Sequence, residues 1–146
     1  MSDLGSLTMD KIQAPVNPPD GTWLATIISG KKKGKRHENG PEKSYLFALV
    51  VAEPQKDVSA AEIEAKGPVS EYNAVFHEIP VFDKRAYWTL KKFALMAGLS
   101  EEKQNGIEPD DIPALLKDHK ILVTGEEVFE EGRDPRWKIS GFGSAA

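Results

Sequence analysis

The fold is decided by one stretch of the chain, which reads Gly21-Thr-Trp-Leu-Ala-Thr-Ile-Ile-Ser-Gly30, then Lys31-Lys-Lys-Gly-Lys-Arg-His-Glu-Asn-Gly-Pro-Glu-Lys43, then Ser44-Tyr-Leu-Phe-Ala-Leu-Val-Val-Ala-Glu53. The two outer parts are rich in β-branched and aromatic residues and are bounded by Gly and Pro, so each predicts a β-strand. The middle part predicts a loop. Five Lys and one Arg against two Glu give this loop a net charge of +4, whereas the whole chain carries −4.

This basic loop has two interpretations. It is either the solvated tip of a β-hairpin or an arm that follows the backbone of a nucleic acid. The flanking strands favour a small closed barrel, because Trp23, Ala25 and Ile27 share one face of the first strand and the opposite face is also largely apolar. The second strand is apolar from Tyr45 to Val51, which predicts a central strand covered on both faces.

The rest of the chain supplies three more strands and the helices. Residues 55–70 predict a polar excursion with a short helix, and residues 71–81 a third strand. Asp83 is a good N-cap for a helix over 84–97, with Gly98 just past its end. Residues 100–118 hold six carboxylates and two Lys, a net charge of −4, with a short helix after Asp111. Residues 119–131 and 136–142 predict the last two strands, joined by a tight turn.

Three strands, a helix and two further strands follow the order of an OB-fold. The sequence therefore predicts a mainly β protein with one or two helices, built as a five-stranded OB-like Greek-key barrel whose main helix lies between strands three and four. Residues 21–142 would form this single domain. Residues 1–20 are expected to form a flexible N-terminal arm and residues 143–146 a flexible tail.

Composition limits the classes of function. The chain has 146 residues, ordinary hydrophobic and charged content, and no Cys. The lack of Cys excludes disulfides, thiol catalysis and Cys-based zinc sites, and it fits a reducing cytoplasm. No apolar run approaches the roughly 20 residues of a membrane helix, and residues 1–20 show no signal-peptide pattern. We therefore expect a cytoplasmic protein with no membrane partner.

The fold prediction gives the basic loop a function. In an OB-fold the loop between strands one and two and the loop between strands four and five lie on the same side, and with strands two and three they form the oligonucleotide site. Both loops are basic here, so we expect them to converge. The candidate phosphate contacts are Lys31, Lys32, Lys33, Lys35, Arg36, Lys43, Arg133, Arg136 and Lys138. The candidate rings for stacking on bases are Tyr45, Phe47, Tyr72 and Phe76, with Trp137 and Trp88 as further candidates.

The sequence carries no enzyme signature. It has no phosphate-binding loop of the Walker type and no His-Glu-x-x-His pair, and its three His stand at no metal-ligand spacing. We predict a non-enzymatic protein with no catalytic residues, no cofactor and no metal. Two alternatives stay open. One is a two-metal nuclease built from the acidic segment, and the other is an interaction or phage assembly component that uses this segment and residues 55–70.

Several stretches are similar to small phage-encoded single-stranded-DNA-binding proteins. Pro19-Asp-Gly-Thr-Trp-Leu-Ala-Thr-Ile27, the Lys-rich loop and the following Tyr-Leu-Phe strand resemble their opening. Leu90-Lys-Lys-Phe-Ala-Leu-Met-Ala-Gly-Leu99 resembles the helix ahead of their acidic stretch. Leu115-Leu-Lys-Asp-His-Lys-Ile-Leu-Val123 and the final Trp-Lys-Ile-Ser-Gly-Phe resemble their closing strands.

This resemblance covers the chain from Pro18 onward and lies in pattern and order. It implies an OB-type fold and largely sequence-independent binding of single-stranded DNA in phage replication or recombination. It also implies replication or recombination proteins as further partners, in the cytoplasm of an infected bacterium. Such proteins often end in an acidic tail that recruits partners, whereas this chain ends in Gly-Ser-Ala-Ala and keeps its acidic residues inside the sequence.

Overall fold

The computed structural model describes residues 8–11 and 16–145. It is a five-stranded antiparallel barrel with the strand order β3-β2-β1-β4-β5. The strands are β1 (Gly21–Gly34), β2 (Lys43–Pro54), β3 (Val75–Val81), β4 (Lys120–Val128) and β5 (Arg136–Gly143). The barrel is nearly closed, because β3 and β5 at the two ends of this order contact each other. The predicted mainly β, OB-like fold is confirmed.

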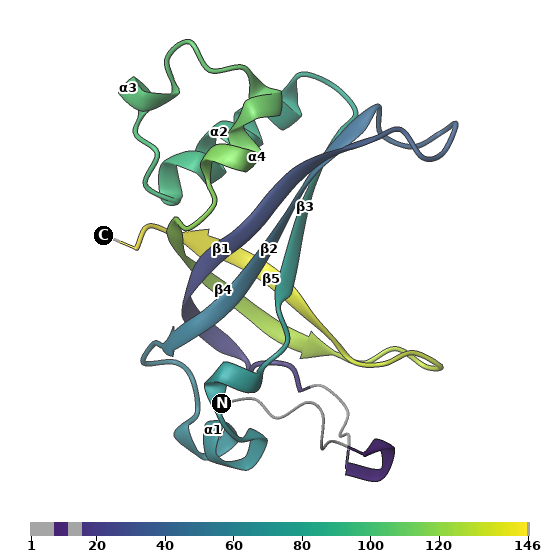
Figure 1. Cartoon of the computed structure of the whole chain (residues 1–146), viewed down its shortest axis with the longest axis vertical. Coiled ribbons are helices and arrows are strands. Elements are labelled where there is room, and N and C mark those ends of the chain that lie inside the picture. Colours follow the sequence, from purple (N-terminus) through teal and green to yellow (C-terminus); the bar gives the residue numbers. More distant parts are fainter. Residues whose placement is uncertain (1–7, 12–15, 146) are drawn as a thin grey trace.

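The helices lie before β1 and in the connections between strands. The short 3-10 helices are labelled η. The helices are η2 (Met9–Lys11), α1 (Ala60–Lys66), η3 (Val69–Glu71), α2 (Arg85–Met96), α3 (Glu101–Gln104), η4 (Pro109–Asp111) and α4 (Ile112–Leu115). The elements from α2 to α4 lie between β3 and β4 and gather at one end of the barrel (Figure 1). Within the described ranges, no helix combines the length and the apolarity that crossing a membrane would demand.

The strands bury alternate residues, as a half-buried sheet requires. Trp23 and Ile27 of β1 and Tyr45 and Phe47 of β2 are fully buried inside the barrel. Leu46, on the opposite face of β2, is only half-buried, so the prediction that this strand is covered on both faces is wrong there. The barrel thus has a closed core and an outer sheet face that solvent can reach.

Several element boundaries differ from the prediction, and β3 begins at Val75 and not at residue 71. β1 continues to Gly34, because its ladder with β2 runs on to the pair Gly34 and Lys43, so the first lysines of the basic loop lie on a strand. The β4–β5 ladder ends at Val128, short of the predicted end at residue 131, and Phe129 beyond it is 74% exposed. Gly143, predicted to begin the tail, is the last residue of β5.

Helix α2 buries one apolar stripe against the barrel. Leu90, Phe93 and Ala94 are buried, and Gly98 follows the helix with a φ of 90°, a conformation that glycine adopts without strain. The helix begins at Arg85, and the Asp83 carboxylate accepts a hydrogen bond from the Arg85 amide at 2.8 Å. Asp83 therefore satisfies a free amide of the first turn although it is not the N-cap residue.

The seam between β3 and β5 is closed by three rings. His77 of β3 lies 4.5 Å from the ring centroid of Phe142 of β5 and 5.3 Å from that of Phe93 of α2. Phe93 and Phe142 also meet each other, at 4.9 Å. Burial among these apolar rings lowers the pKa of His77 to about 4, because the charged imidazolium loses its water there. His77 is therefore a neutral, half-buried member of this ring cluster.

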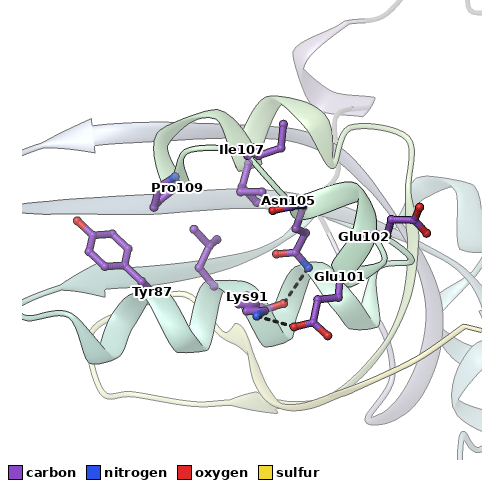
Figure 2. A pocket seen from close by; sticks show the side chains of 11 residues that line it. Tyr87, Lys91, Glu101, Glu102, Asn105, Ile107 and Pro109 are labelled. Carbon is purple, nitrogen blue, oxygen red and sulfur yellow. Dashed lines mark hydrogen bonds and ion pairs between the residues drawn. The ribbon is translucent and has the colours of Figure 1, made fainter.

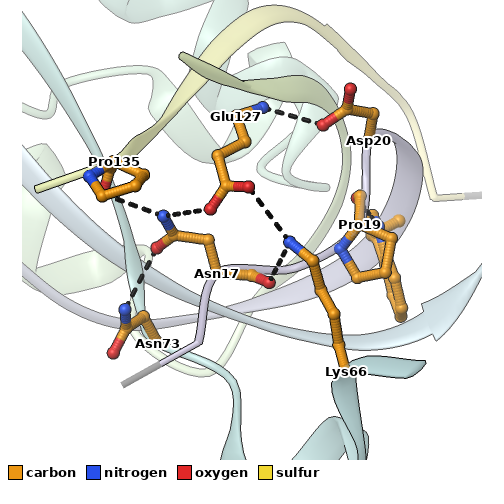
Figure 3. Close-up of polar contacts among 8 residues, drawn as sticks. Asn17, Pro19, Asp20, Lys66, Asn73, Glu127 and Pro135 are labelled. Atoms are coloured by element: carbon orange, nitrogen blue, oxygen red, sulfur yellow. Dashed lines mark hydrogen bonds and ion pairs between the residues drawn. The ribbon is translucent and has the colours of Figure 1, made fainter. Parts of the chain in front are cut away.

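The N-terminal segment is packed at residues 16–20, contrary to the predicted flexible arm. Pro18 and Pro19 are fully buried, and Asn17 donates from Nδ2 to Glu127 Oε2 at 2.9 Å and to the Pro135 carbonyl at 3.0 Å. Asn73 donates to Asn17 Oδ1 at 3.0 Å (Figure 3). This segment ties β4 and the β4–β5 hairpin to the start of β3. Residues 1–7 and 12–15 of the predicted arm lie outside the described residues.

The low pKa of His77 makes the stability of the fold depend on pH. In the unfolded chain His77 titrates near its ordinary pKa of 6.5, and in the folded chain near 4. Between these values only the unfolded chain binds the proton, so the free energy of unfolding falls as the pH is lowered through this window. From pH 7 to pH 5 we expect the free energy of unfolding to fall by about 2 kcal/mol. Urea unfolding at the two pH values measures this loss.

Substitution separates His77 from other titrating groups. In His77→Phe, which keeps a ring in the seam, most of this loss should disappear. His37→Gln removes an exposed histidine in the β1–β2 loop and should leave the loss intact. An equal loss in the wild type and in His77→Phe would contradict the assignment.

Candidate nucleic-acid interface

The two basic hairpins stand at opposite ends of one side of the barrel. The β1–β2 and β4–β5 hairpins project to the same side in Figure 1, with β3 between them. The prediction that the two loops converge is therefore wrong, because each hairpin extends its own pair of strands away from the barrel. The hairpins instead bracket the outer face of the sheet.

The alternation of β1 divides its three consecutive lysines between two sides of the arm. Lys31 is paired in register with Leu46, and Lys32 with Tyr45. Leu46 lies on the outer face and Tyr45 points into the barrel, so Lys31 faces outward and Lys32 faces the helices. Lys33 follows Lys31 on the outer side by the two-residue period. A β-bulge between Ile27 and Ser29 precedes this arm.

On the helix-facing side, one carboxylate holds three donors. Asp110 Oδ1 accepts from Lys43 Nζ at 2.8 Å and from the Tyr45 hydroxyl at 2.6 Å, and Lys32 Nζ lies 3.5 Å from Asp110 Oδ2. The bonds from Lys43 and Tyr45 hold the pKa of Asp110 near 2. The same carboxylate raises the pKa of Lys43, with the Tyr87 hydroxyl as a second cause. Burial, followed by the bond to Asp110, raises the pKa of Tyr45.

On the outer face, an aromatic ring and an arginine line one groove. Phe76 of β3 is 61% exposed and stands in register with Ala48 of β2. A groove of about 580 Å³ runs from Phe76 to Arg136 at the start of β5, with Asn73 and Trp137 also in its wall. The indole N–H of Trp137 is buried and has no hydrogen-bond partner among the described residues. The groove thus joins a stacking surface on β3 to a cation from the β4–β5 hairpin.

The predicted cations fall into two groups. Lys32 and Lys43 are paired with Asp110, Arg36 with Glu78 at 3.3 Å, and Arg133 and Arg136 with Glu130 at 3.7 and 3.0 Å. Among the described residues, four predicted phosphate contacts form no ion pair: Lys31, Lys33, Lys35 and Lys138. An exposed ion pair typically contributes about 0.2–1 kcal/mol, so a phosphate can compete for the exposed side chains of Lys32, Arg36, Arg133 and Arg136.

Most of the predicted stacking rings belong to the core. Tyr45 and Phe47 have no exposed surface and Tyr72 is 7% exposed, so the prediction that they stack on bases is wrong for this structure. Phe47 packs against Phe93 at 4.6 Å, and Tyr72 against Trp23 at 5.9 Å. They occupy the inward positions of their segments. Trp137 is also 7% exposed, which leaves Phe76 and Trp88 as the exposed rings of the predicted set.

Trp88 is exposed, although packing under another segment is the ordinary expectation for a Trp on a helix. It is 57% exposed on α2, with Lys91 and Lys92 Nζ at 5.9 and 5.7 Å from its ring centroid. These are cation–π distances. Trp88 lies on the helical end of the molecule, outside the groove that contains Phe76.

The acidic segment forms a cavity with α2. Figure 2 shows Tyr87 and Lys91 of α2 on one side of this cavity and Ile107 and Pro109 on the other. The cavity has a volume of about 500 Å³. Lys91 Nζ is paired with Glu101 at 3.0 Å. In the described part of the chain, carboxylates and histidines form no group of three or more that could hold a metal ion.

Comparison with known proteins does not assign the chain to a class. No protein-family model matches it, and no curated protein sequence matches it at a significant level. The function must therefore be argued from the two sides of the β1–β2 arm and from the groove beside Phe76.

The position of Asp110 depends on a close approach between α4 and β1. A Cβ at Gly30 would lie 2.6 Å from the Pro113 carbonyl oxygen and 3.0 Å from the Phe47 ring. Gly30→Ala should therefore push α4 away from β1 and cost about 2 kcal/mol, as overpacking does. Urea unfolding measures the cost. Gly34→Ala is the matched control on the same strand, because its Cβ meets nothing within 4 Å, and equal stability of the two variants would contradict the close contact.

Proposed function

We propose that this protein binds single-stranded DNA, largely without regard to base sequence and without catalysing a reaction. The observation that carries the proposal is the groove that both Phe76 of β3 and Arg136 of the β4–β5 hairpin line. Lys31 and Lys33 extend the cationic surface along the outer side of the β1–β2 arm. The OB-like barrel supports this placement, since OB-folds bind oligonucleotides on this face.

The proposed mechanism combines two weak interactions. An exposed ring stacks on any base, since every base has a π-face, and lysines and arginines neutralise the phosphates. The chain is acidic overall, with a net charge of −4, so the attraction must come from the local cations of the two hairpins. The resemblance to phage single-stranded-DNA-binding proteins supports a role in protecting or organising DNA during phage replication or recombination, in the cytoplasm of the infected host.

A second candidate function is binding of a partner protein through the acidic segment. The cavity between α2 and this segment favours it, because it offers Tyr87 and Ile107 beside exposed carboxylates. Fluorescence anisotropy with labelled oligo-dT and a duplex of equal length distinguishes the two. Single-strand binding that weakens with salt supports the first function. Lack of binding at low salt would contradict it and leave the partner surface.

The outward lysines should account for part of the salt dependence. In Lys31→Ala/Lys33→Ala, two phosphate contacts are lost, so the slope of log K against log salt should become shallower by about 1.4. The loss of affinity should be similar for all base sequences, measured by anisotropy with oligo-dT and a mixed-sequence strand.

The charge-matched control is Lys56→Ala/Lys103→Ala. Both lysines are exposed and lie outside the arm, one after β2 and one in α3. This control should keep the slope of the wild type. A slope that changes equally in the two double variants would show that net charge, and not the arm, determines binding.

Phe76 should contribute stacking energy. Phe76→Ala should weaken binding of oligo-dT by about 1–3 kcal/mol, or about 5- to 150-fold in Kd, while stability changes little because the ring is 61% exposed. Phe82→Ala is the control, because Phe82 is 67% exposed but follows β3 outside the groove. If both variants bind as the wild type does, Phe76 does not stack on DNA.

A further inference from the structure

We infer that Lys32, Lys43 and Tyr45 form a second phosphate site, on the helix-facing side of the β1–β2 arm, and that the Asp110 carboxylate occupies it until single-stranded DNA displaces it. The inference rests on the proposed function and concerns the regulation of the same arm. It is carried by three donors from two paired strands that meet on one acidic side chain.

The chemistry of the cluster suits a phosphate. A carboxylate and a phosphate diester both present charged oxygens to ammonium and hydroxyl donors, and charge-assisted bonds to either are short and strong. The donors are fixed by the barrel: Lys32 and Tyr45 are register partners in the β1–β2 ladder, and the ring of Tyr45 is fully buried. The site is therefore built before any ligand arrives.

The acceptor belongs to a less rigid element. Asp110 lies in η4, a 3-10 helix of three residues, and its side chain is 39% exposed. Solvent and a ligand can reach it. The segment before η4 contains Gly106, which has a φ of 80°, so the connection is a turn and not a continuous helix. Movement of η4 would release the donors without breaking a strand.

The location links this site to the outer lysines. Lys31 and Lys33 face one side of the arm and Lys32 faces the other, so the arm carries cations on both sides. With Asp110 in place, Lys32 is paired on the inner side, whereas Lys31 and Lys33 on the outer side form no ion pair among the described residues. Displacement of Asp110 would let the same strand of DNA contact both sides.

The competing explanation is that Asp110 only tethers the helical segment to the arm. Asp110→Asn and Asp111→Asn separate the two, because each removes one negative charge from η4 but Asp111 has no contact with the three donors. If the site binds phosphate, Asp110→Asn should bind oligo-dT about fivefold or more tightly than Asp111→Asn, with a salt slope steeper by about 1.4.

A double-mutant cycle tests the same site from the side of the donors. Lys32→Ala should weaken binding by a larger factor in Asp110→Asn than in the wild type, because only the variant presents Lys32 to DNA in every molecule. The ¹³C resonance of the Asp110 carboxyl can be followed in the wild type. This measurement does not depend on the folding of a variant. The resonance should shift when oligo-dT saturates the protein, while that of Asp111 changes little.

The outcomes separate this inference from the proposed function. If the wild type binds oligo-dT but Asp110→Asn is no tighter than Asp111→Asn, or the Asp110 resonance stays unchanged in the complex, the second site is wrong and the outer interface stands. If the wild type and both variants fail to bind at low salt, the proposed function is wrong and the second phosphate site falls with it.

Discussion

The pairing of β1 with two neighbours is the constraint on which the rest of the structure depends. The first half of β1 pairs with both β2 and β4, and its pairing with β4 extends to Thr26. Beyond the bulge after Ile27, β1 pairs with β2 alone. There α4 lies beside β1, and the absence of a side chain at Gly30 permits the contact. The same strand therefore belongs to the barrel in one half and to the projecting arm in the other.

This division of β1 determines which side of the arm each lysine faces. An extended ladder forces successive side chains to opposite sides, so the run of lysines divides its charges between the two sides of the arm. The outer side of the arm continues the sheet face that holds Phe76, and the inner side meets the helical segment at Asp110. Local geometry, and not the net charge of the chain, thus decides where an anion can bind.

The sequence predicts what depends on local pattern. The succession of strands and helices along the chain, the buried stripe of α2 and the position of Gly98 follow from periodicity and capping. The same two-residue period places Phe76 opposite Val75 and Ile79, but it does not tell which face is inside, so Tyr45 and Phe47 looked as suitable for stacking as Phe76. Contacts between distant residues leave no local signal: nothing in the acidic segment distinguishes Asp110, which reaches Lys43, from its neighbour Asp111.

The contact at Asp110 also shows that the basic arm and the acidic segment are not independent surfaces. The cations of one are the ion-pair partners of the other, so the energy of an anion on the inner side includes the cost of releasing η4. That cost is moderate, because the Asp110 side chain is partly solvated and exposed pairs contribute little. A ligand that moves η4, whether it binds the cavity beside Tyr87 or the arm itself, changes the charge that the arm presents. Both candidate functions therefore involve the same hydrogen-bond acceptor, the Asp110 carboxylate.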